Sequence, residues 1–170
     1  FRSVSYTGAD SGIAALRHGL EYLLFRSGAV TSNACEGGLF ASSDGNDDWP
    51  DIQLHFMPAM LPSHQTIGGH GVTVLCSALR PKSRGRLRLA SSDPAADPLI
   101  DTNFLSHPDD IRVNIAALRV GRAVMNAPSF ARLHGGEVFP GHDCDSDAAL
   151  GDYVRRTAKT DFHPVGTCRM

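Results

Sequence analysis

Residues 51–57 read Asp-Ile-Gln-Leu-His-Phe-Met, a stretch in which apolar and polar residues alternate. Ile52, Leu54 and Phe56 fall on alternate positions, which is the period of a β-strand with one face against a core. The alternation therefore predicts a strand whose apolar face is buried. His55 is expected to face the opposite side, where a lone strand histidine is most often a surface residue or a satisfied core residue.

Three further stretches, at residues 36–42, 71–80 and 86–90, are also predicted to be strands. Residues 81–85 read Pro-Lys-Ser-Arg-Gly, which has the composition of a turn. The strands on either side of this turn are therefore predicted to be antiparallel neighbours in one sheet.

Three segments have helical periodicity. Apolar residues recur at helical spacing between residues 11 and 28, which predicts an amphipathic helix lying on a core. Residues 106–109 predict a capped start for a long helix that ends near Asn126. A last helix is predicted to start at Ser146 and to carry Leu150, Tyr153 and Val154 inward. The fold class expected is α+β, an antiparallel β-sheet with helices on one face.

Composition narrows the possible partners. The chain has 170 residues, enough for one domain, with 16 basic and 18 acidic residues and no long run of either sign. This balance predicts no nucleic-acid partner. The longest apolar stretch, residues 72–79, is well short of the roughly 20 residues of a membrane helix, so no integral membrane segment is predicted.

Cysteines and histidines give two weaker signals. The four cysteines (Cys35, Cys76, Cys144 and Cys168) form no C-x-x-C pair. They are interpreted as reduced thiols of a cytoplasmic protein, with disulfide bridges as the alternative. His64 and His70 lie in a Pro- and Gly-containing loop without a cysteine or carboxylate at ligand spacing, so no metal site is predicted.

Residues 161–170 read Asp-Phe-His-Pro-Val-Gly-Thr-Cys-Arg-Met, and packing alone does not explain this choice of residues. Pro164 pushes His163 into extended backbone geometry. Gly166 lets the backbone pass close to another surface, where a Cβ atom would collide. The segment therefore presents one histidine in a fixed pose.

The eight residues from His163 onward resemble the signature around the active-site histidine of the glucose-methanol-choline (GMC) flavoprotein oxidoreductases. Residues 80–86, 100–105 and 108–110 also resemble segments of the choline-dehydrogenase-like branch, in the same order. The resemblance implies that residues 1–170 are a substrate-binding domain fragment of a larger FAD-dependent enzyme.

The implied reaction is oxidation of an alcohol, choline-like or another primary alcohol, by hydride transfer to the flavin. His163 would act as general base, a role that suits a side chain with an ordinary pKa of about 6.5. The electron acceptor would be oxygen or a quinone-like compound. Substrate contacts are expected from His55 and from Glu36, for which a solvated strand entrance is an equal alternative. The resemblance assigns cofactor contacts to residues 164–167, Pro164, Val165, Gly166 and Thr167.

The chain has no G-x-G-x-x-G fingerprint, and residues 68–71 (Gly-Gly-His-Gly) do not replace it. The dinucleotide site is therefore expected outside residues 1–170, and the chain alone is expected to be inactive. Two alternatives stay open: a hydroxynitrile lyase-like member of the same fold family that performs no redox chemistry, and a non-catalytic remnant domain used for binding.

Overall fold

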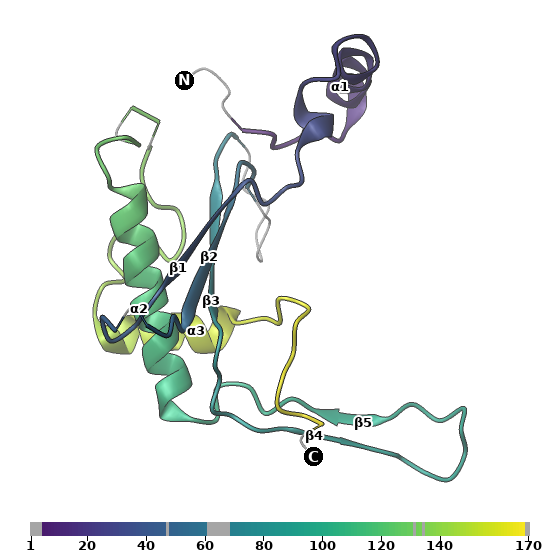
Figure 1. Ribbon diagram of the computed structural model, residues 1–170, viewed down its shortest axis with the longest axis vertical. Coiled ribbons are helices and arrows are strands. Elements are labelled where there is room, and N and C mark those ends of the chain that lie inside the picture. The colour runs from purple at the N-terminus through teal and green to yellow at the C-terminus, as the bar shows by residue number, and fades with distance from the viewer. Residues whose placement is uncertain (1–4, 47, 61–68, 131, 134, 169–170) are drawn as a thin grey trace.

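The computed structural model describes residues 5–46, 48–60, 69–130, 132–133 and 135–168. Of the residues discussed above, His64, Gly68, Arg169 and Met170 lie outside the described part. The elements in chain order are α1 (Gly12–Phe25), the 3-10 helix η1 (Ala29–Thr31), β1 (Gly37–Ala41), β2 (Ile52–Met57), β3 (Thr73–Ala78), β4 (Arg86–Arg88), β5 (Leu99–Asp101), α2 (Pro108–Met125) and α3 (Asp147–Thr157) (Figure 1).

The predicted strand at residues 51–57 is confirmed as β2, the central strand of an antiparallel sheet with the order β1-β2-β3. In this register Leu54 lies opposite Leu39 of β1 and Cys76 of β3. Because side chains alternate along each strand, these three residues share one face of the sheet. The same face carries Ile52, as the alternation predicted.

Helix α2 covers this face (Figure 1). Ile52 and Leu54 are 0% and 3% exposed and pack against Ala117 of α2, which is 0% exposed. Burying an aliphatic side chain of this size contributes roughly 1.5–3 kcal/mol. The helix comes close to β3 at Gly121, where an added Cβ atom would lie 3.2 Å from Sγ of Cys76. A glycine at this position therefore sets the distance between the helix and the sheet.

The second side of α2 packs on α3. Ile111 and Ile115 of α2 form a cluster with Leu150 of α3, which is 0% exposed. Val154 is also buried, whereas Tyr153 is half-buried. The predicted inward positions Leu150 and Val154 are thus confirmed. With α2 and α3 in place, the structure is α+β as predicted.

The predicted helix starts are also found. His107 caps α2, because its Nδ1 accepts a hydrogen bond from the backbone N–H of Asp109 at 3.2 Å. Ser146 caps α3 by accepting from the backbone N–H of Ala149 at 3.2 Å. Each cap satisfies a backbone donor that the first turn of a helix leaves without an intrahelical partner.

The predicted pairing of residues 71–80 with residues 86–90 is wrong. Arg86–Arg88 instead pairs with Leu99–Asp101, a strand that the sequence analysis did not predict. These two short strands form an arm that projects from the body of the molecule (Figure 1). The physical reason lies in residues 81–85, which are held on α2 by Asp110 and so do not form the tight turn that their composition suggests.

The expectation that the first helix lies on a core is not met among the described residues. Helix α1 forms close to the predicted range, but none of its residues is buried. Ile13 is 87% exposed and Leu24 is 72% exposed. Among the helices and strands described, α1 contacts only η1. Helical periodicity predicted the helix correctly, but periodicity does not say whether a partner for the apolar face lies within the same chain.

Candidate active site

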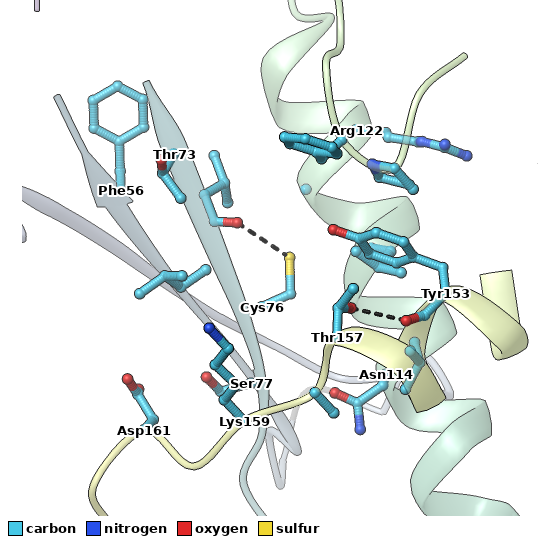
Figure 2. Close-up of a pocket in the computed structure, with 18 of the residues that line it drawn as sticks. Phe56, Thr73, Cys76, Ser77, Asn114, Arg122, Tyr153, Thr157, Lys159 and Asp161 are labelled. Atoms are coloured by element: carbon cyan, nitrogen blue, oxygen red, sulfur yellow. Dashed lines mark hydrogen bonds between the residues drawn. The ribbon is translucent and has the colours of Figure 1, made fainter. Parts of the chain in front are cut away.

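A groove of about 2140 Å³ runs along β3, and β3, α2, α3 and the chain that follows α3 form its walls. Figure 2 shows side chains from all four elements pointing into the same space, among them Thr73, Asn114, Tyr153 and Asp161. Its lining also includes many apolar side chains, such as Phe56 and Val74. A concave, mainly apolar surface with a few polar groups is typical of a small-molecule site.

Two titratable groups in the groove are unsuited to proton transfer near neutral pH. Burial raises the pKa of the Cys76 thiol to about 12, so this thiol stays protonated. Burial likewise raises the pKa of Tyr153 above its ordinary value. Neither group is a thiolate or phenolate nucleophile at physiological pH, which leaves the imidazole and carboxylate groups of the groove as candidates.

His163 lies on the segment that follows α3, and it lines the groove. His163, Pro164 and Val165 are all exposed, so the chain presents them to the open side. A hydrogen bond from the backbone N–H of Gly85 to the carbonyl oxygen of Gly166, 3.1 Å long, fixes the far end of this segment. Figure 1 shows the same segment running back to lie beside β4.

The close passage predicted at Gly166 is confirmed. Its φ of +88° lies in the left-handed region, and an added Cβ atom would be 3.2 Å from the carbonyl oxygen of Ser83. Both observations require a glycine. Thr167, the next residue, is half-buried and has its hydroxyl 3.9 Å from Sγ of Cys168. Gly166 and Thr167 do not line the groove, whereas Pro164 and Val165 do.

His55 lies on the face of β2 that turns away from α2, as predicted. His55 does not line the groove, but Asp161 does. Nδ1 of His55 lies 3.5 Å from a carboxylate oxygen of Asp161. The side chains of His55 and Asp161 are 21% and 39% exposed. The structure thus brings His55 to the segment that carries His163, through a residue to which the sequence analysis gave no role.

Glu36 lies immediately before β1 and is exposed. It lines the same groove as His163. The groove is lined by three imidazoles, those of His70, His142 and His163, and by six carboxylates, those of Glu36, Asp110, Glu137, Asp143, Asp145 and Asp161. The carboxylates of Glu36 and Asp161 are exposed enough to meet a ligand.

Arg122 of α2 forms an ion-pair cluster that fixes another wall of the groove. Its Nε donates to both carboxylate oxygens of Glu137, at 3.0 and 3.1 Å, and its Nη1 donates to Asp145 at 3.1 Å. Its Nη2 donates to the carbonyl oxygens of Gly141 and Cys144. The hydrogen bond to Glu137 is the main cause that raises the pKa of Arg122. The sequence spacing of these groups gave no signal of this cluster.

Three other features of the described residues bear on function. All four cysteines are free thiols. Within the described ranges, no group of three or more His, Cys, Asp or Glu side chains is arranged to hold a metal ion. None of the helices in that part of the chain combines the length and apolar character needed to cross a bilayer.

The chain belongs to the GMC oxidoreductase family, because residues 81–170 match the family model of that name. The matched region includes the loop at residues 81–85, helices α2 and α3, and the His163 segment. It therefore covers more than half of the chain.

Two relatives match over most of this chain. An alcohol dehydrogenase [acceptor] of Pseudomonas putida is 41% identical over 169 residues, which are 98% of this chain and 30% of that protein. An oxygen-dependent choline dehydrogenase of Klebsiella pneumoniae (strain 342) is 40% identical over 154 residues, 89% of this chain and 28% of that protein. The chain thus spans less than a third of the length of these relatives.

A solved structure has the same fold. It is a formate oxidase of Aspergillus oryzae RIB40, studied for the effect of a mutation on FAD modification, and it matches with a TM-score of 0.79 at 25% identity. The match covers 96% of this chain and 34% of the formate oxidase chain. The arrangement of sheet, helices and C-terminal segment is therefore shared with a protein that is about three times as long.

Proposed function

We propose that residues 1–170 are the substrate-binding portion of a larger FAD-dependent oxidoreductase that oxidises an alcohol, with His163 as the general base. The observation that carries this proposal is the placement of His163. Its imidazole lies at the open side of a groove, on a segment that Gly85 fixes three residues further along. Membership of the GMC family and the similarity to an alcohol dehydrogenase and a choline dehydrogenase support the same reaction class.

The chemistry of the step explains why a histidine is needed. A hydride leaves the carbinol carbon of an alcohol readily only when the hydroxyl proton is removed as well. A neutral imidazole can take that proton, and a positioned general base contributes about 10²–10⁴-fold to a rate. His163 would take the proton at one of its ring nitrogens, and the flavin, when bound, would supply the hydride acceptor.

The residues present fit one side of a flavin and not the rest of FAD. Exposed Pro164 and Val165 border a groove of about 2140 Å³, which is larger than a small-molecule site requires. We propose that residues 164–167 contact the ring system, Pro164 and Val165 from the groove wall and Gly166 and Thr167 from just beyond it. Pyrophosphate binding needs a glycine-rich turn at a helix N-terminus, and no G-x-G-x-x-G occurs in residues 1–170.

The substrate is proposed to be a primary alcohol, with choline as one option. His55 and Glu36 are the proposed substrate contacts. A cationic alcohol would be attracted by the carboxylates of Glu36 and Asp161, which both line the groove. The acceptor that reoxidises the flavin is oxygen or a quinone-like compound. We also propose a cytoplasmic location, because free thiols are typical of reducing compartments.

The test is the variant His163→Ala, made in an FAD-loaded protein that contains this chain. We expect anaerobic reduction of the flavin by alcohol to slow by about 10²–10⁴-fold, while FAD stays bound. The matched control is His18→Ala, because His18 lies on α1 and does not line the groove. Equal reduction rates in both variants and the parent would refute the proposed role of His163.

The same experiment separates the redox reaction from the lyase alternative. An alcohol oxidoreductase bleaches its flavin when alcohol is added without oxygen. A hydroxynitrile lyase-like protein keeps the flavin oxidised and instead cleaves a cyanohydrin. Reoxidation of the bleached flavin by air, compared with reoxidation by a soluble quinone, then identifies the acceptor.

A further inference from the structure

A buried carboxylate lies close to the start of α2. Asp110 is only 3% exposed. Its Oδ1 accepts a hydrogen bond from the backbone N–H of Lys82 at 2.7 Å, and its Oδ2 accepts one from the backbone N–H of Ser83 at 2.9 Å. The hydroxyl of Ser83 donates to the same Oδ2. Burying an ionised carboxylate is costly, so three donors converging on one side chain indicate a position that the structure defines tightly.

The loop that supplies these donors, residues 81–85, is fixed from several directions. Oγ of Ser83 also accepts from the backbone N–H of His107 at 3.0 Å. The Arg84 guanidinium donates to the carbonyl oxygens of Pro81, at 2.7 Å, and Ser83, at 2.9 Å. The carbonyl oxygen of Arg84 in turn accepts from the side-chain amide of Asn103 at 2.8 Å. The loop is therefore a hydrogen-bonded unit attached to α2 through Asp110.

The same loop holds the segment that carries His163. The backbone N–H of Gly85 donates to the carbonyl oxygen of Gly166. At Gly166, an added Cβ atom would lie 3.2 Å from the carbonyl oxygen of Ser83 and 3.3 Å from Cδ of Arg84. The backbone of Gly166 therefore lies directly against the backbone of the loop at residues 81–85, so a shift of the loop would move Gly166 with it.

The other end of the segment has its own contact, between a carboxylate oxygen of Asp161 and Nδ1 of His55 at 3.5 Å. His163 lies between these two attachments. An exposed histidine gains little orientation from its own surroundings, and here the backbone on either side supplies it. The attachment at Gly166 depends on a loop whose position is set by Asp110.

We propose that Asp110 is a positioning residue for the oxidation, because it fixes the pose of His163 through the loop at residues 81–85. This inference rests on the proposed role of His163. Asp110 need not touch the substrate or the flavin. Asp110 lines the groove, but its carboxylate oxygens accept from the loop. Misplacement of a reacting group by about 1 Å can cost about 10²-fold in rate, so an attachment of this kind can affect catalysis strongly.

The variant that tests the proposal is Asp110→Asn, in the FAD-loaded protein. We expect the rate constant for flavin reduction to fall by about 10–100-fold. We expect the KM for alcohol to change by less than about 3-fold, because substrate contacts are retained. Asp152→Asn is the charge-matched control: Asp152 lies on α3 away from the loop and pairs with the exposed side chain of Arg155, so reduction should change less than about 2-fold.

A second readout reports the attachment directly and does not depend on activity. Hydrogen exchange of the Gly85 amide reports whether Gly166 is attached, because this amide donates to Gly166. We expect Asp110→Asn to speed this exchange by at least about 10-fold, with and without FAD. Leu150→Ala, a truncation in the α2–α3 core, is the control for general destabilisation and should not speed Gly85 exchange selectively relative to other amides.

Gly166→Ala covers the case in which Asp110→Asn does not fold. This variant leaves Asp110 intact and displaces the segment, so the Gly85 amide should lose protection while the amides of Lys82 and Ser83 keep theirs. Flavin reduction should slow by the same factor as in Asp110→Asn. In the double variant the two losses should not add, because both act through one attachment.

Three outcomes overturn the proposal: an unchanged reduction rate in Asp110→Asn, slower reduction with unchanged Gly85 exchange, or equal rate losses in Asp110→Asn and Leu150→Ala. Failure of the proposed function looks different. In that case His163→Ala reduces flavin at the parent rate, whereas the Gly85 exchange data still report whether Asp110 fixes the segment.

Discussion

A carboxylate oxygen of Asp161 lies 3.5 Å from Nδ1 of His55, so the central strand of the sheet meets the segment that carries His163. The core side of β2 packs against α2. Its other side, at His55, contacts the segment that carries His163. One strand therefore both anchors the fold and helps to position that segment.

This contact gives a prediction for His55→Ala. We expect a KM for alcohol about 10-fold higher and a rate of flavin reduction lower by less than about 3-fold, because a binding contact is lost and the base is retained. Asp161→Asn should share part of this effect, and the double variant should fall short of the sum of the two single effects. Steady-state and anaerobic stopped-flow kinetics measure both constants. If neither constant changes in His55→Ala, His55 is a surface residue.

Lowering the pH should weaken the attachment of residues 81–85 to Asp110. Burial raises the pKa of Asp110, but the hydrogen bonds from Ser83 and Lys82 outweigh it, so the pKa in the folded state lies below the ordinary value of about 3.9. A carboxyl group with a lowered folded-state pKa stabilises the fold fully above its unfolded pKa, and this contribution is lost as the pH falls through the folded pKa.

The free energy of unfolding should therefore differ most between the parent and Asp110→Asn at pH 5–7, by about 1–3 kcal/mol, the usual cost of unsatisfied buried donors. The difference should shrink as the pH falls below about 4. Urea unfolding at a series of pH values measures it. Asp152→Asn should show a much smaller difference at every pH, because Asp152 pairs with an exposed arginine. A pH-independent difference for Asp110→Asn would contradict the assignment.

Local periodicity accounts for the parts of the fold that were predicted. β2, α2 and α3 each have a regular apolar pattern, and Ile52, Leu54, Leu150 and Val154 are buried as expected. The turn reading of residues 81–85 failed because Asp110, far along the chain, takes the backbone donors of Lys82 and Ser83. A side chain that binds a distant loop leaves no signal in the composition of that loop.

The candidate site, too, could be predicted only in part from the sequence. The sequence pointed to His163 and to the close passage at Gly166, because Pro164 and Gly166 are local signals. The partners of these residues, Ser83 and Gly85 for Gly166 and Asp161 for His55, come from tertiary contacts. Arg122 and its cluster were missed for the same reason. Residue type suggested the chemistry, and tertiary contacts supplied its geometry.

Alanine substitution of two glycines, one in α2 and one in α3, is expected to have opposite effects on the free energy of unfolding. At Gly121 of α2, a Cβ atom would lie 3.2 Å from Sγ of Cys76 on a β-strand, so Gly121→Ala should lower the free energy of unfolding by about 1–2 kcal/mol through overpacking. At Gly151 of α3 the nearest atoms are 3.5 Å away, which is an ordinary contact. Gly151→Ala should therefore raise stability by up to about 1 kcal/mol through helix propensity. Urea unfolding of both variants tests the pair, and a Gly121→Ala variant as stable as the parent, or more stable, would show that the spacing between α2 and β3 is not limiting.

The last prediction concerns residues 1–170 expressed alone, which should neither retain FAD nor oxidise an alcohol. FAD binding requires a strand, a glycine-rich turn and a helix N-terminus for the pyrophosphate, and this sequence has no such fingerprint. His163, Pro164 and Val165 are exposed on a segment that is attached through Asp161 and Gly166, so the segment offers one wall of a site. Absorbance at the flavin bands, measured after incubation with FAD and dialysis, tests retention, and dye-linked turnover of several primary alcohols tests activity. A stoichiometric yellow protein, or turnover that His163→Ala abolishes, would show that these residues hold the cofactor without further sequence.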